Sequence, residues 1–155
     1  MWRQRFLFDM PSPIVTSSNL LELHIWMTHF TDLLYLLDGR FNQLHTFHVN
    51  ILIIKCTSST IHSGEKLPNL RCFSLCSVMR IHFYDELIVP LLHRMLNLEK
   101  LDLQLELDRN KGFINGIDLK ENIINYMPRL NKFTFNIRLF NRLPNQINLP
   151  SNEDI

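Results

Sequence analysis

The sequence predicts an α/β solenoid of about five repeats, with a curved parallel sheet on its concave side and short helices and loops on its convex side. Two observations support this fold class: one short motif recurs five times, and three of the four connections between its copies carry helical apolar spacing. The motif is a Leu followed by apolar residues three and five places later. Its copies are Leu20/Leu23/Ile25, Leu44/Phe47/Val49, Leu70/Phe73/Leu75, Leu98/Leu101/Leu103 and Leu130/Phe133/Phe135.

The spacing of the motif predicts one strand per repeat. Successive leading leucines lie 24, 26, 28 and 32 positions apart, a unit length typical of solenoids. The last two apolar residues of each copy are two apart, so on a strand they face the same side, and stacked copies can bury that side in one core. We therefore expect parallel strands in sequence order, near residues 22–26, 46–50, 72–76, 100–104 and 132–136.

The segment before each strand is also repeated. A polar residue precedes every leading leucine. These residues are Asn19, Gln43, Asn69, Asn97 and Arg129. The four residues that end at the leading leucine are similar in three copies: Leu-Pro-Asn-Leu at 67–70, Met-Leu-Asn-Leu at 95–98 and Met-Pro-Arg-Leu at 127–130. The chain is therefore expected to enter each strand in the same way.

The first and third connections predict helices. Residues 28–37 precede Asp38-Gly39, a good helix stop. Residues 84–95 form the second such segment, and Pro90 would kink this helix unless it falls near the first turn. The expected core-facing residues are Phe30, Leu33, Leu34 and Leu37 in the first helix, and Leu87, Leu91, Leu92 and Met95 in the second.

The fourth connection predicts a helix over residues 119–127, opened by a capping box of Asp118 and Glu121. Its expected core-facing residues are Ile123, Ile124 and Met127. Residues 56–66 are polar and rich in Ser and Thr, so we expect a loop there and a second loop over 111–116.

Residues 18 to about 140 resemble a leucine-rich-repeat protein, of the irregular, helix-containing type found in F-box leucine-rich-repeat proteins. Many such repeats carry an Asn or Cys three places after the third apolar residue, where it satisfies loop backbone groups. Here those places hold Thr28, Leu52, Val78, Glu106 and Arg138. Other groups must therefore satisfy the loops.

The resemblance implies a protein-protein interaction module, and its implied role is the substrate-recognition part of an F-box ubiquitin-ligase adaptor. The F-box itself is not in this chain, so a ligase scaffold is expected as a partner only if an F-box lies upstream. The alternative is a structural or regulatory binding scaffold with no ubiquitin-ligase connection. Only an upstream reading frame or a pull-down for ligase components separates the two.

Function in this architecture is expected on the concave face, where the residues between the core positions point outward. The predicted protein-binding residues are Glu22, His24, Trp26, Thr46, His48, Asn50, Ser74, Lys100, Asp102, Gln104, Lys132, Thr134 and Asn136. A solvated sheet face would be polar in the same way. An exposed Trp26 favours an interface anchor, although it could equally cap the terminal turn.

Three groups of residues on this face raise the question of a catalytic triad, a metal site or a disulfide. Ser74 lies between His48 and Asp102, whereas a serine triad needs the imidazole between hydroxyl and carboxylate. His24 and His48 could share a metal ion with Cys76, but two solvated histidines on the surface are the simpler interpretation. Cys72 and Cys76 are four residues apart on one strand, beyond disulfide reach. The sequence therefore predicts no enzyme, no cofactor and no metal.

Composition limits the partner and the compartment. The 155 residues suit one domain, predicted as a repeat region over 18–140 with an N-terminal segment 1–17 that is a partial repeat or flexible and a C-terminal tail 141–155. Both ends suggest a piece of a longer solenoid or a short paralogue. The net charge of +1 disfavours nucleic acid and membrane surfaces, leaving another protein as the expected partner. Three cysteines without framework spacing predict reduced thiols in the cytoplasm, with the nucleus as an alternative.

Overall fold

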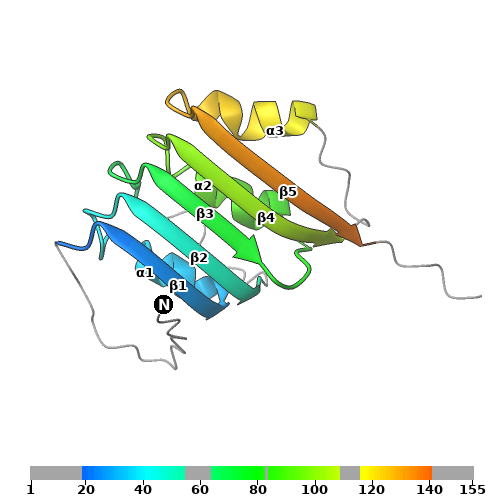
Figure 1. Cartoon of the computed structure of the whole chain (residues 1–155), viewed down its shortest axis with the longest axis horizontal. Helices are drawn as coiled ribbons and strands as arrows, with labels where there is room; N and C mark the ends of the chain where they lie inside the picture. Colours follow the sequence, from blue (N-terminus) through cyan, green and yellow to red (C-terminus); the bar gives the residue numbers. More distant parts are fainter. Residues whose placement is uncertain (1–18, 55–63, 83, 109–115, 141–155) are drawn as a thin grey trace, which may run out of the picture.

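Five parallel strands form a single sheet in the computed structural model, which describes residues 19–54, 64–82, 84–108 and 116–140 (Figure 1). The strands are β1 (Glu22–His29), β2 (Thr46–Ile53), β3 (Cys72–Ser77), β4 (Lys100–Asp108) and β5 (Lys132–Phe140). Their order in the sheet is β1-β2-β3-β4-β5, and every neighbouring pair is parallel. The predicted strands, their order and their direction are confirmed, and each strand runs further than predicted.

The motif sets the register of the sheet. Phe47 pairs with Phe73, and Phe73 pairs with Leu101, so equivalent motif positions lie side by side. The same holds one step further along, where Leu75 pairs with Leu103. All five of these side chains have at most 2% of their surface exposed. Stacked motif copies therefore build the core, as expected from the alternation of side chains along a strand.

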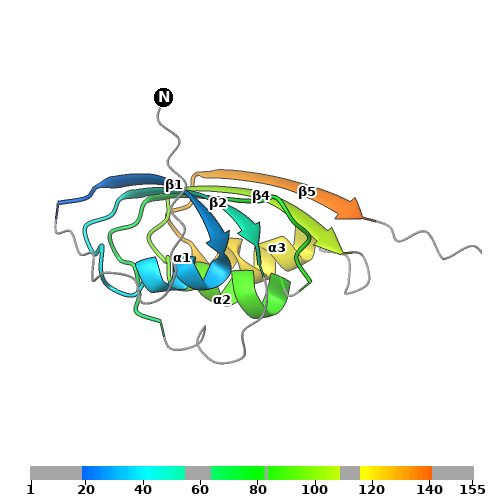
Figure 2. The ribbon, with the colours of Figure 1, turned by 90° about the horizontal axis from the view of Figure 1, so that it is seen from below.

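The described helices all lie on one side of the sheet (Figure 2). They are α1 (Phe30–Leu36), α2 (Val89–Leu92) and α3 (Gly116–Asn122), and a π-helical turn (Tyr84–Ile88) precedes α2. The other side of the sheet carries no described helix. We call it the open face, and it consists of the outward-pointing residues of β1 to β5.

The first predicted helix is shorter than expected, because β1 extends through Thr28 and His29. Leu34 is partly buried and packs against the core, as predicted, and Leu36, which the spacing did not predict, is also buried. Gly39 follows the helix with φ of +73°, which confirms the helix stop, since Gly adopts this region without steric cost. The prediction is confirmed for Phe30, Leu33 and Leu37.

The second predicted helix begins as the π-helical turn and continues as α2. Pro90 lies in the first turn of α2, directly after the π-helical turn, so the winding of the helix changes next to the residue that has no N–H to donate. Four residues point into the core as predicted. They are Leu87, Leu91, Leu92 and Met95.

The third predicted helix begins at Gly116, earlier than expected. Asp118 therefore lies within its first turn, and the predicted capping box is wrong. A 3-10 helix (Ile124–Tyr126) follows α3 and tightens the winding to three residues per turn. This change turns Ile124 outward, so that it is 40% exposed, while Ile123 and Met127 are buried as predicted.

Several predictions fall on residues outside the described part of the chain. These are the segments before residue 19 and after residue 140, most of the predicted loop at 56–66, and most of the predicted loop at 111–116. Gly116 begins α3 and is therefore not part of a loop. Residues 64–66 lie in neither helix nor strand, as predicted.

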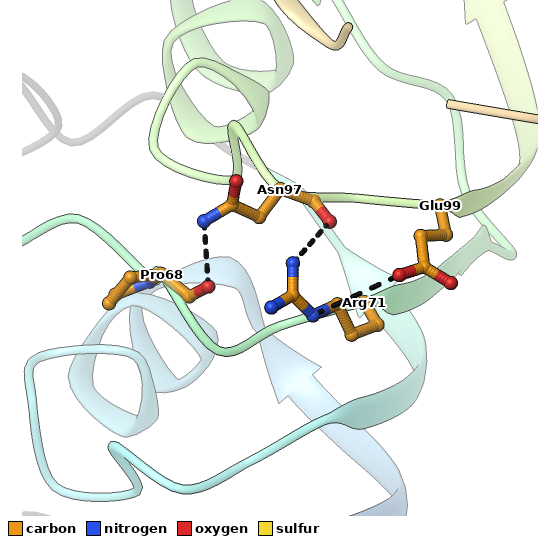
Figure 3. Close-up of polar contacts among 4 residues, drawn as sticks. All are labelled: Pro68, Arg71, Asn97 and Glu99. Carbon is orange, nitrogen blue, oxygen red and sulfur yellow. Dashed lines mark hydrogen bonds and ion pairs between the residues drawn. The ribbon is translucent and has the colours of Figure 1, made fainter. Parts of the chain in front are cut away.

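Asparagines at the strand starts connect neighbouring repeats. The Asn69 amide donates to the Asn42 carbonyl at 2.8 Å, and the Asn97 amide donates to the Pro68 carbonyl at 2.9 Å. Both acceptors stand two places before a leading leucine, so the two bonds are equivalent. Arg71 adds a bond to the Asn97 carbonyl at 3.3 Å (Figure 3). Loop carbonyls are thus satisfied at the start of the strands rather than three places after the motif.

A buried arginine joins the helical side of the first and third connections. Arg94 is 7% exposed, and its Nη2 donates to the Leu37 carbonyl at 2.7 Å while its Nε donates to the Glu65 carbonyl at 2.8 Å. Leu37 is the C-cap of α1, where a cation is favoured by the helix dipole. A Cβ at Gly64 would overlap the Arg94 guanidinium, so a larger residue here would have to displace the arginine side chain.

Candidate functional site

The open face collects the predicted binding residues in three rows that cross the strands. Cα partners in the sheet define each row. The first row is Glu22, Thr46, Cys72, Lys100 and Lys132; the second is His24, His48, Ser74, Asp102 and Thr134; the third is Trp26, Asn50, Cys76, Gln104 and Asn136. The structure therefore brings all the predicted residues onto one surface.

The rows differ in exposure along the sheet. Exposed residues are Glu22, His24, Lys100, Gln104, Lys132, Thr134 and Asn136, and partly buried ones are Trp26, Thr46, His48, Asn50, Ser74 and Asp102. The exposed Trp expected from the sequence is thus partly buried. Cys72 and Cys76 are free thiols, as predicted.

A shallow depression of about 440 Å³ lies over the first two rows. Its lining crosses all five strands, from Glu22 on β1 to Lys132 and Thr134 on β5. Side chains of both charges face it, together with hydroxyl groups and an imidazole. Such a surface can accept an extended polypeptide or a loop, because it offers hydrogen-bonding groups along its whole length.

Two histidines stack at the β1 side of the depression. The rings of His24 and His48 lie 4.3 Å apart between centroids and 20° from parallel, and His24 Nε2 contacts the Glu22 carboxylate. Burial lowers the pKa of His48, and the neighbouring His24 lowers it further, while Glu22 and Asp102 oppose the shift. His48 therefore favours the neutral form.

Asp102 is the hydrogen-bonding centre of the face. Its Oδ2 accepts from Ser74 Oγ at 3.4 Å and from Gln104 Nε2 at 3.2 Å, while its Oδ1 is buried without a partner among the described residues. The serine thus bonds the carboxylate directly, with no imidazole between them. This geometry does not form a serine triad, because the histidine must connect the other two groups. Burial and the charge of Asp102 also raise the pKa of the Cys76 thiol.

Two lysines stand side by side at the β4–β5 end of the depression. Lys100 and Lys132 are Cα partners, and both side chains are exposed. Among the described residues neither forms an ion pair. Like charges directly opposite on neighbouring strands repel each other.

A fourth row of the open face was missed from the sequence. This row lies two residues beyond the third row along each repeat. It consists of Thr28, Leu52, Val78, Glu106 and Arg138. The strands β1, β2, β4 and β5 extend through this position, and a second depression of about 240 Å³ is lined in part by Glu106 and Arg138. The signal was present, because the apolar alternation continues for one more step at Met27, Ile51, Leu105 and Ile137.

Within the described ranges, no group of three or more His, Cys, Asp and Glu side chains is placed to hold a metal ion. No helix in the described part of the chain has the length and apolar composition required to cross a membrane. Comparison of the chain with protein-family models, with curated proteins and with solved structures found no match.

Proposed function

We propose that this chain is a leucine-rich-repeat-like solenoid module that binds another protein on its open face. The observation that carries the proposal is the alignment of five motif copies in one parallel sheet, whose helix-free side presents in-register rows of polar side chains. Each repeat adds one strand and one connection, as stacked repeats do. Repeats of this kind offer extended surfaces to partners.

The chemistry of the depression supports binding rather than catalysis. It is broad and shallow, and lining groups such as Ser74 and Asp102 already bond each other. Enzyme sites are typically concave pockets that enclose most of a small ligand. A wide surface with polar groups of both signs suits a protein partner better.

The role of substrate recognition within an F-box ubiquitin-ligase adaptor is the narrower form of this proposal. It rests on the resemblance of the repeats alone. A scaffold without any ligase connection would present the same open face. Purification of the tagged protein from cells, followed by mass spectrometry for ligase components, separates the two roles.

Charge reversals on the two sides of the sheet test the general proposal. Lys100→Glu, Asp102→Lys and Lys132→Glu change the open face, whereas Glu121→Lys changes an exposed residue of α3 on the other side. Proteins captured by the wild type should be lost with the open-face variants and retained with Glu121→Lys, provided that circular dichroism shows all variants folded. Retention by the open-face variants together with loss by Glu121→Lys would place the binding surface on the helices.

A further inference from the structure

Between Lys100 and Glu106, the open-face side chains of β4 form four cross-strand pairs with β5, and only one of them joins like charges. Asp102 faces Thr134, Gln104 faces Asn136, and Glu106 faces Arg138. The first of these pairs carries one negative charge, the second is neutral and the third joins opposite charges. Lys100 and Lys132 form the fourth pair, at the strand starts.

Lys100 and Lys132 place two positive charges next to each other on neighbouring strands. Neighbouring strands are about 4.8 Å apart, so the two positive side chains leave the sheet close together. Among the described residues no carboxylate forms an ion pair with either lysine. Glu22 and Asp102 line the same depression, but Glu22 contacts His24 and Asp102 accepts from Ser74 and Gln104, so neither bonds to these lysines.

Both lysines line the larger depression, so a group that settles there meets them together. An anion placed between two ammonium groups removes their mutual repulsion and gains two charge-assisted hydrogen bonds. Conversely, a cationic partner group at this position would add to the repulsion. The electrostatics therefore favour a partner of one sign at this end of the surface.

We infer that the partner is an acidic segment of a protein, which places an Asp or Glu carboxylate between Lys100 and Lys132. The inference rests on the proposed function and names the chemistry of the partner. The carboxylate bridges β4 and β5, and the rest of the segment crosses the depression toward β1, over the hydroxyl groups and His48. Specificity comes from the lysine pair, since it is the one pair among these four that joins two positive charges.

Selection from a random peptide library displayed on phage tests the inference. The library is selected on three proteins: the wild type, the double variant Lys100→Glu/Lys132→Glu, and a matched control Lys66→Glu/Lys120→Glu. Lys66 and Lys120 are exposed and lie outside β1 to β5, so the control carries the same change in net charge. Circular dichroism and thermal melting establish that all three proteins are folded.

Peptides selected on the wild type and on the control should be enriched in Asp and Glu, and those selected on the double variant should be enriched in Lys and Arg. The tightest wild-type peptide, synthesised with an amidated C-terminus so that only side-chain carboxylates are offered, should bind the double variant about tenfold more weakly and the control with little change. Equal binding to wild type and double variant, or selection without any acidic enrichment, overturns the inference.

The position of the bound peptide distinguishes failure of the acidic-partner inference from failure of the proposed function. A photo-crosslinker on the selected peptide should label residues of β3, β4 and β5 on the open face. Labelling of the open face by peptides without acidic residues would reject only the acidic chemistry. Labelling of α1, α2 or α3 would reject the open face itself, and the acidic inference with it.

Discussion

The middle of the sheet and its C-terminal end are built from the same motif, yet they differ in burial. In β3 and β4 the apolar residues Leu75, Leu101 and Leu103 are at most 1% exposed. In β5 the equivalent residues Phe133 and Phe135 are only partly buried. Exposure continues on the adjoining connection, where Ile117, Ile124 and Tyr126 are 66%, 40% and 49% exposed.

The difference shows that burial depends on the neighbours of a repeat as well as on its sequence. A central repeat is covered from both sides, whereas β5 is covered by β4 alone within the described sheet. Phe133 and Phe135 are larger than the leucines of β4, yet they stay partly exposed because β5 has one neighbouring strand in the described sheet. We therefore expect equivalent substitutions to cost more in the middle than at the C-terminal end.

The largest contrast should come from the leading leucines of the fourth and fifth copies. Leu98 is 0% exposed, and Leu130 is partly buried at the same motif position. Leu98→Ala should lower the free energy of unfolding by about 2 to 5 kcal/mol, because it removes buried methyl groups and leaves a cavity. Leu130→Ala should cost about half as much. Urea denaturation measures both, and equal losses would contradict the comparison.

A smaller difference in stability is expected between variants of Arg94 and Arg129. Arg94→Met removes both donors from the Leu37 and Glu65 carbonyls and should cost about 1 to 3 kcal/mol, since buried acceptors are left without partners. Arg129→Met, at an exposed position near β5, should stay within about 0.5 kcal/mol. Thermal melts measure the stability of both variants. Equal shifts in their melting temperatures would refute the structural role of Arg94.

The asparagine bonds allow a test that should stabilise the weaker end. Asn97→Ala removes the donor to the Pro68 carbonyl and should cost about 1 kcal/mol. Arg129 occupies the equivalent place in the last copy, and Arg129→Asn should add a bond to the Leu96 carbonyl. A gain of up to about 1 kcal/mol in urea melts is expected. A loss instead would show that the last turn departs from the geometry of the earlier ones.

The smallest effect is a pH dependence confined to the β1–β2 side of the open face. The pKa of His48 is lower in the folded protein than its usual 6.5, mainly through burial and then through His24. The unfolded chain therefore binds the proton more readily, so stability is full above about pH 6.5 and declines as the pH falls through the folded pKa.

Replacing His48 should flatten this part of the profile. His48→Gln should reduce the loss of stability below pH 6.5, because the replacement does not titrate. Lys132→Gln, on the opposite side of the depression, should leave the slope unchanged in this range. Urea melts over a pH series measure both, and an unchanged slope in His48→Gln would assign the dependence to other groups.

Much of the candidate surface could be predicted because side chains alternate along a strand. Once Leu101 and Leu103 are inward, Lys100, Asp102 and Gln104 must point outward, and the repeat aligns them with their equivalents on other strands. The motif ends at its third apolar residue and therefore does not predict the fourth row. The bonds around Asp102 could not be predicted, since they depend on distances between side chains of different strands.

The sequence by itself determined the number of strands, their parallel order and the inward residues, because a motif of constant form specifies local alternation and a repeat length. Tertiary structure decided where the helices start and stop, as at Gly116 and Ile124, because packing against the sheet outweighs weak end signals in such short helices. It also decided the contacts of Arg94 with carbonyls 29 and 57 residues away. Such contacts follow from how repeats stack, and no local pattern records them.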